Sequence, residues 1–166
     1  MDRPVQPLDS ETMRLAMRRW ASGITVVTSI HGGERHGMTV SSFTSVSLTP
    51  PLVLVALEWG TRTHRLVKLS NIFGVTILSH QQHEVSDRFA GRQTEYTDRF
   101  HNLITYSLTT GASFLAGGLA GFDCRVVATH EAGNHTLFIG EVLAAKIEPD
   151  ANPLIYYNRS YRQLNS

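Results

Sequence analysis

The sequence predicts a mainly β protein, folded as an antiparallel barrel with short flanking helices. Three observations lead to this prediction. Six or seven β-rich segments follow one another at hairpin spacing, the expected helices are short, and the repeating βαβαβ pattern of a doubly wound sheet is absent. The 166 residues suit a single domain over 1–166, and a chain of this length buries roughly 70% of its unfolded surface. We expect residues 1–8 to form a loose N-terminal arm.

An amphipathic helix is expected before the first strand. Apolar residues recur at spacings of three and four over Leu8–Trp20, with Asp9 and Ser10 as possible N-caps. The β-branched run Ile24–Ile30 then predicts a strand, and the glycines of the segment 31–34 predict a hairpin turn. A second extended segment is expected within Gly37–Leu48.

The middle of the chain is predicted to hold an apolar strand and two short helices. Pro50–Pro51 should stop strand pairing, because proline lacks an amide hydrogen. Leu52–Glu58 is continuously apolar up to its last residue and is expected to be a strand buried on both faces. Helices are expected at His64–Leu69 and Gln81–Ala90, on either side of a strand at Ile72–Leu78.

The last third is dominated by two long β-rich runs. Phe122–Glu131 and His135–Ile147 are separated by a short glycine-containing turn, and Leu154–Tyr157 should form a last short strand. The glycine-rich residues 91–121 are expected to form a long connection, and connections of that length are usually functional or mobile.

Composition excludes several classes of protein. Fifteen basic residues balance fourteen acidic ones, for a net charge of +1, so no large field attracts nucleic acid or an anionic membrane. One cysteine, Cys124, excludes an intrachain disulfide and a multi-cysteine metal site. No apolar run approaches the ~20 residues that span a bilayer. We therefore expect a soluble, cytoplasmic protein that binds neither nucleic acid nor membrane.

The usual catalytic motifs are missing. The chain has no Gly-x-Ser-x-Gly elbow, no dinucleotide glycine fingerprint and no phosphate loop. Cys124 alternates with apolar strand residues and is expected to be a packing thiol. His80 and His83 could share a helix face, but no second ligand pair stands nearby, so no metal site is expected. Glu58 and Glu141 are expected to be structural or ligand-contacting.

Two short segments have the residue types of a nucleotide site. Gly37–Ser45 carries five hydroxyl side chains, which leave room for a ligand beside the backbone and supply donors. Glu58–His64 spans a strand end and a helix start, where amide groups favour a phosphate. The alternatives are an edge strand with polar side chains for the first segment and simple N-capping by Thr61 or Thr63 for the second.

In order along the chain, five segments resemble the flavin reductase-like family, which includes the small reductase components of two-component flavin-dependent monooxygenases. The resemblance extends over about residues 13–162. The matching segments are Met17–Thr28, Gly37–Pro51, Asp87–Gly91, Gly133–Val142 and Pro153–Tyr157.

The resemblance implies a Greek-key split β-barrel, normally a homodimer, that reduces FMN or FAD with NADH or NADPH. Hydride would pass directly to flavin N5, which needs no acid–base pair on the protein. Reduced flavin would then reach a partner oxygenase. Asn134 stands where the family often has Asp, which leaves the choice between NADH and NADPH open.

The resemblance also implies roles for particular residues. His135 and Tyr157 would lie on the nicotinamide side. The remaining predicted contacts are all to the flavin. The isoalloxazine would be lined by Thr39, Val40, Ser41, Ser42 and Phe43; the phosphate held by Thr61, Arg62 and Thr63 with Ser41 or Ser42; and the ribityl or phosphate side flanked by Arg88 and Phe89.

Two other functions fit parts of this pattern. A split-barrel protein could bind flavin or haem without turnover, as a carrier or sensor. A pyridoxal-type oxidase has a similar architecture, but it needs a cluster of Lys and Arg for its substrate phosphate. The chain contains only two lysines, Lys68 and Lys146, which argues against the oxidase.

Overall fold

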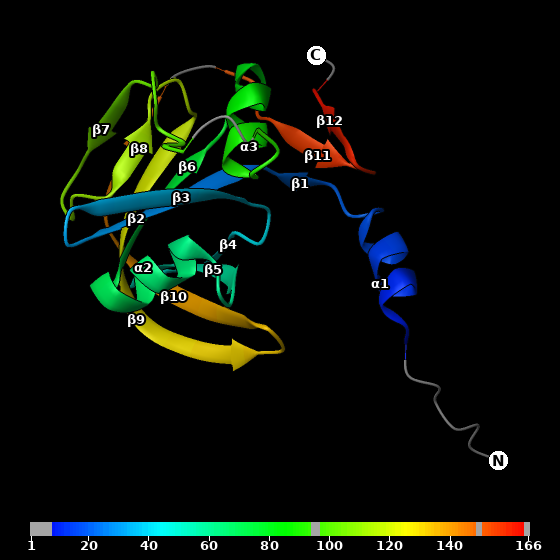
Figure 1. The fold of residues 1–166 in the computed structure, drawn as a ribbon, viewed down its shortest axis with the longest axis horizontal. Coiled ribbons are helices and arrows are strands. Elements are labelled where there is room, and N and C mark those ends of the chain that lie inside the picture. Colours follow the sequence, from blue (N-terminus) through cyan, green and yellow to red (C-terminus); the bar gives the residue numbers. More distant parts are fainter. Residues whose placement is uncertain (1–7, 94–96, 149–150, 165–166) are drawn as a thin grey trace.

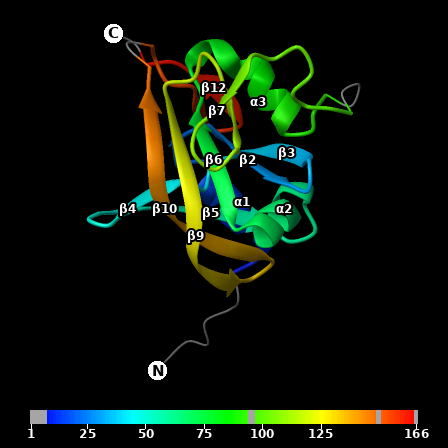
Figure 2. The ribbon, with the colours of Figure 1, turned by 90° about the vertical axis from the view of Figure 1, so that its left-hand side faces the viewer.

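The computed structural model describes residues 8–93, 97–148 and 151–164 (Figure 1). A seven-stranded sheet forms its body, and neighbouring strands in that sheet are antiparallel. In order across the sheet, the strands are β3 (Glu34–Val40), β2 (Thr25–His31), β6 (Ile72–Ile77), β9 (Ala120–Ala132), β10 (His135–Ile147), β5 (Pro51–Glu58) and β4 (Thr44–Leu48). Figure 2 shows β9 and β10 as long strands on one side of the barrel. The predicted antiparallel, mainly β fold is confirmed.

Smaller elements surround the barrel. They are the sheet of β1 (Ser22–Gly23), β11 (Ile155–Tyr157) and β12 (Ser160–Arg162); the pair β7 (Thr105–Ser107) and β8 (Ser113–Leu115); and the helices α1 (Ser10–Met17), α2 (Arg62–Ser70) and α3 (His83–Phe89), the last preceded by a 3-10 turn at His80–Gln82. Helix α1 stands away from the barrel (Figure 1), and none of its residues is buried. Among the described helices, none is long and apolar enough to cross a membrane.

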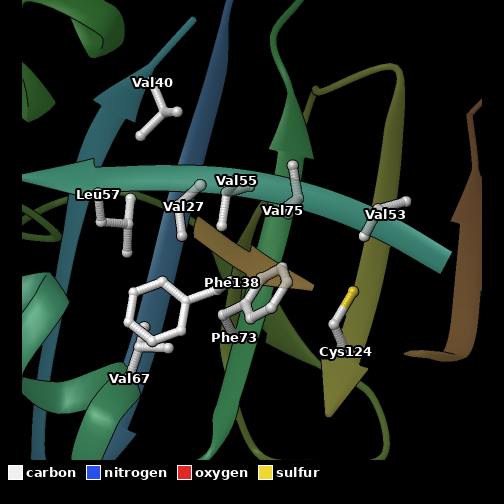
Figure 3. Close-up of a cluster of buried hydrophobic side chains, with 10 residues drawn as sticks. All are labelled: Val27, Val40, Val53, Val55, Leu57, Val67, Phe73, Val75, Cys124 and Phe138. Carbon is white, nitrogen blue, oxygen red and sulfur yellow. The ribbon is translucent and has the colours of Figure 1, made fainter. Parts of the chain in front are cut away.

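The sheet curls around one apolar cluster. Its side chains come from six strands and from α2, and they point into the barrel (Figure 3). They are Val27, Val40, Val53, Val55, Leu57, Val67, Phe73, Val75, Cys124 and Phe138. Burying each large side chain contributes about 1.5–3 kcal/mol. Cys124 is a buried packing thiol, as predicted, and burial raises the pKa of its sulfhydryl to about 12.

Two predictions about β5 were wrong. Its buried residues alternate with half-buried ones, so only one face of Leu52–Glu58 lies in the core, as in an antiparallel strand that is covered on one side. Pro51 does not stop pairing, because it begins β5 opposite Leu48. A proline is tolerated as the first residue of a strand, where its missing amide hydrogen costs no ladder bond. The Pro50 peptide, in the turn before it, is cis.

The long connection 91–121 is more structured than expected in the part that the structure describes. It contains β7 and β8, and a second apolar cluster that includes Phe89, Phe100 and Leu115 packs beneath it. Asp123, fully buried on β9, anchors it by accepting hydrogen bonds from the amide and hydroxyl of Thr110. Most of the predicted N-terminal arm, residues 1–7, lies outside the described residues.

Polar contacts fasten α2 to the start of β3. Glu34 accepts hydrogen bonds from Arg62 Nε at 2.5 Å and from Arg65 Nη2 at 2.7 Å, and these lower the pKa of its carboxyl. Two residues further along β3, His36 Nδ1 lies 2.9 Å from the hydroxyl of the buried Thr63. This arrangement sets where the N-terminus of α2 stands against the barrel.

Glycine 140 makes the core packing of β10 possible. A Cβ there would lie 2.5 Å from Phe73 Cζ and 2.9 Å from Cys124 Cβ. We therefore expect Gly140→Ala to lower the free energy of unfolding by about 1–3 kcal/mol through overpacking. Urea unfolding measures this. Gly23→Ala is the matched control, since a Cβ at that position meets nothing within 4 Å; equal losses in the two variants would contradict the packing argument.

His36 makes stability depend on pH. Burial first, and then Arg99 and Arg62, lower its pKa from 6.5 to about 4. The unfolded chain therefore binds more protons between pH 6.5 and pH 4, so the free energy of unfolding falls as pH falls through that window. Between pH 7 and pH 5, we expect the free energy of unfolding to fall by about 1 kcal/mol less in His36→Gln than in the native protein. The difference is small because the side chain is only half-buried. Urea unfolding of both proteins at the two pH values tests it, and parallel losses would refute it.

Candidate functional site

A hollow of about 190 Å³ lies between the end of β3, α3 and the C-terminal strands. Its lining mixes hydroxyl groups, two phenols and one guanidinium around a small apolar floor. The lining residues are Ile24, Thr39, Ser41, Ser86, Ala90, Arg92, Tyr156 and Tyr161. A second hollow of about 350 Å³ adjoins it, since Ser41 and Tyr156 line both.

A hydrogen-bond network holds the walls of the smaller hollow. The Tyr161 hydroxyl donates to Asp87 Oδ1 at 2.6 Å and lies 2.9 Å from the Ser86 hydroxyl. Arg92 Nη1 donates to the same Asp87 oxygen at 2.6 Å, and Arg92 Nη2 lies 3.4 Å from the Tyr156 hydroxyl. Burial, followed by the contact with Asp87, raises the pKa of Tyr161. Both phenols are therefore positioned before any ligand arrives.

Thr39 joins β3 to this network. Its hydroxyl donates to the Ser86 carbonyl oxygen at 2.6 Å, which ties β3 to α3. Ser41, directly after β3, is exposed at the junction of the two hollows. Of the five residues predicted to line the isoalloxazine, Thr39 and Ser41 thus line the smaller hollow.

The other three predicted isoalloxazine residues are engaged by the barrel. Val40 belongs to the apolar core. Ser42 donates to the Ala56 carbonyl oxygen at 2.8 Å, which fastens the β3–β4 loop to β5. The Phe43 ring stacks on Phe122 at 5.8 Å between centroids. These residues hold the loop in place, and their contact with a flavin stays a prediction.

A second polar group forms where β5 ends and β10 begins. His135 stands opposite Glu58 in the ladder between β10 and β5. The side chain of Asn134 forms a hydrogen bond with each of them. Asn134 Nδ2 donates to Glu58 Oε1 at 3.0 Å, which leaves its Oδ1 to accept from His135 Nδ1 at 2.8 Å. The second ring nitrogen, Nε2, is thereby left for a ligand. Thr61 caps α2 beside them, since its side-chain oxygen accepts from the His64 amide at 3.4 Å. Its hydroxyl donates to the Glu58 carbonyl oxygen at 2.8 Å.

The predicted phosphate residues Arg62 and Thr63 contact the start of β3, whereas Thr39 lies toward its end. Arg62 pairs with Glu34, and Thr63 is fully buried beside His36. The structure thus does not bring the segment 61–63 into the hollow that Thr39 lines. Its phosphate contact stays a prediction, and the alternative that Thr61 is an N-cap is confirmed.

The predicted residues near the C-terminal strands divide in the same way. Arg88 Nη1 donates to the His101 carbonyl oxygen at 2.8 Å, and Phe89 is fully buried against Phe100. Tyr157 is half-buried in β11, whereas its neighbour Tyr156 lines both hollows. Flavin contacts of Arg88 and Phe89 and a nicotinamide contact of Tyr157 stay predictions.

Sequence reasoning missed four polar or aromatic residues that line the hollow from α3, from the segment after it and from the C-terminal strands, namely Ser86, Arg92, Tyr156 and Tyr161. Three of them lie within one residue of a segment that it had singled out. The sequence does not reveal which side chains of a helix or strand point toward the hollow. Ser86 and Phe89 are both buried on α3, but only Ser86 lines the hollow.

Comparison with known proteins identifies the family of the chain. The family model described as "Flavin reductase like domain" matches residues 17–165. The chain is 38% identical to an NADH-dependent flavin reductase of Rhodococcus sp., over 99% of this chain and 90% of that one. It is 37% identical to the reductase component of a resorcinol hydroxylase of Rhizobium sp., over 91% and 85%. The solved structure of flavin reductase PheA2 superposes with a TM-score of 0.88 at 37% identity, covering 96% of this chain and all of that one. The chain therefore belongs to the flavin reductase-like family and has its split-barrel fold.

Proposed function

We propose that this protein is an NAD(P)H-dependent flavin reductase. The match of the family model to residues 17–165 carries the proposal. Two features of the structure support it: Thr39 and Ser41 line the smaller hollow, and the Asn134–His135 pair lies beside the end of β5. Nothing in this arrangement needs a protein nucleophile or an acid–base couple.

The residues at the hollow suit a flavin. Ser41 and the hydroxyl of Thr39 would bind its polar edge, while the adjoining backbone amides favour the negative charge that develops near N1 on reduction. Bound flavin supplies the hydride acceptor, and NAD(P)H supplies the hydride. The protein's own work is to hold both rings in contact and exclude water.

His135 orients the nicotinamide in this proposal. Its ring is fixed by Asn134, which is in turn fixed by Glu58. The free Nε2 atom would receive the carboxamide group of the nicotinamide. An amide at position 134 holds the ring without adding a second carboxylate beside Glu58. Three relatives are named as NADH-dependent, so NADH is the first nucleotide to test.

Reduced flavin would leave the site and reach a separate oxygenase, since several relatives are named as reductase components of monooxygenases. The reaction would take place in the cytoplasm, where NAD(P)H is available.

The protein would act as a homodimer. Apolar side chains of α1 and of the β4–β5 hairpin are exposed, including Met13, Leu15 and Leu48, and a second copy would cover them. Sedimentation equilibrium measures the assembly.

The decisive experiment is a reductase assay with purified protein. NADH and NADPH are each supplied with FMN, FAD or riboflavin, and oxidation is followed at 340 nm under limiting oxygen. We expect turnover with at least one pair. Flavin binding without nicotinamide oxidation would contradict the proposal and favour a carrier or sensor instead.

Replacing His135 separates nicotinamide binding from flavin binding. We expect His135→Ala to raise the KM for NADH about tenfold and to change the KM for flavin less than twofold, because one hydrogen bond is worth about 1.4 kcal/mol or less. Steady-state kinetics with each substrate varied measures both constants. His130→Ala is the control, since His130 is exposed on the neighbouring strand β9. Equal increases in both constants would refute the assignment.

A further inference from the structure

We propose that the larger hollow, between α1 and the β11–β12 turn, binds a nucleoside diphosphate: the ADP half that FAD and NAD(H) share. The proposal rests on the proposed function, because it extends the same nucleotide site outward from Ser41. With a volume of about 350 Å³, the hollow lies within the range of roughly 300–1,000 Å³ that small-molecule sites occupy.

The charge of this hollow suits a pyrophosphate. Three arginines line it, Arg14, Arg18 and Arg159, and the lining contains no acidic residue. Arg14 and Arg18 share the carboxylate of Glu11, at 3.2 and 3.8 Å. Among the described residues, Arg159 forms no ion pair within 4.0 Å. Three positive charges thus line the hollow, with the carboxylate of Glu11 as the partner of two of them. A guanidinium group can bind a phosphate through two parallel hydrogen bonds.

The uncharged part of the lining suits an adenosine. Two aromatic residues line the hollow: Trp20, which is 69% exposed, and Tyr156 on β11. Exposed aromatic faces next to cationic groups are the usual platform for a purine base. Ser22 and Asn158 add short polar side chains of the kind that bind ribose hydroxyls.

Backbone strain singles out Arg159. The two-residue turn between β11 and β12 has left-handed φ at both positions, 48° at Asn158 and 64° at Arg159. Turns of this type favour Asn-Gly, because a side chain at the second position is strained. Here the second position carries an arginine. The turn is also tied to the end of α1, since the Asn158 amide donates to the Arg18 carbonyl oxygen at 3.1 Å.

These observations combine into one argument. A residue that strains its own turn, faces a hollow and lacks a carboxylate partner contributes nothing evident to folding stability. Its guanidinium instead completes a cationic, aromatic hollow that continues directly into the candidate flavin site. A ligand with a base, a ribose and two phosphates satisfies every group that the lining offers.

The first test is calorimetric titration of ADP into the full-length protein without flavin. Arg159→Gly is the informative variant, because glycine suits the left-handed turn. We expect it to raise the melting temperature and to weaken ADP binding about tenfold. Arg162→Ala is the control, since Arg162 is exposed on β12 and does not line this hollow. ADP that binds Arg159→Gly as tightly as it binds the control, or no ADP binding by the native protein at millimolar concentration, would overturn the proposal.

A second titration identifies which nucleotide supplies the ADP half. A loss of affinity for FAD, with FMN as the reference that lacks ADP, assigns the hollow to the flavin. A loss for NAD⁺, with nicotinamide mononucleotide as the reference, assigns it to the nicotinamide nucleotide. A loss for neither dinucleotide overturns the proposal. Since these are binding measurements, they stand apart from the reductase assay: turnover with an unchanged ADP affinity in Arg159→Gly would refute this inference alone.

Discussion

The register of β10 between β5 and β9 is the constraint on which the candidate site depends. Phe138 points into the barrel, and Gly140 leaves the space that Phe73 fills. With these two positions fixed, the strand alternation places His135 beside Glu58 at the barrel end. A slip of one residue would turn the apolar side chains outward and carry His135 to the wrong face. Core packing and ligand geometry are therefore set by the same ladder.

This dependence explains why a mostly apolar scaffold can present a polar site. Close packing of the core holds the strand ends in fixed positions. The polar groups lie at or just beyond those ends. Thr39 and Ser41 lie at the end of β3, and Asn134 and His135 lie at the start of β10. Thr39 is held by its bond to the Ser86 carbonyl oxygen, and Asn134 and His135 are held through Glu58, so these three side chains need little reorganisation for ligand binding. A reaction in which the cofactor supplies the chemistry needs this kind of placement more than it needs reactive side chains.

The sequence predicts the barrel well because strand periodicity and turn glycines are local signals. The run His135–Ile147 was predicted with the bounds that the structure has. Strand facing was harder: a continuous apolar run such as Leu52–Glu58 does not reveal that one face is only half-covered. The shortest strands, among them β1 and β12, carry too few residues for any periodic signal. Strand β1 also pairs with the distant β11, which no local pattern encodes.

The sequence predicted the kind of site better than it predicted the residues that line it. Hydroxyl-rich and strand-end segments indicated where a nucleotide could bind, and Ser41 and Thr39 do face a hollow. Tyr156 and Tyr161 enter it from the small sheet that β11 and β12 form with the distant β1. Such contacts depend on tertiary structure. The neighbouring Tyr157, equally aromatic in sequence, does not line either hollow.

The arginines show how a chain with a net charge of +1 can handle anionic nucleotides. Carboxylates occupy several guanidinium groups in the described structure: Glu34 pairs with Arg62, and Asp87 pairs with Arg92. Both arginines are about half exposed, and exposed pairs of this kind contribute at most about 1 kcal/mol. A phosphate with two negative charges can therefore compete with Glu34 for Arg62 at small cost. The pair with Glu34 therefore does not prevent Arg62 from contacting a phosphate, and that contact stays a prediction.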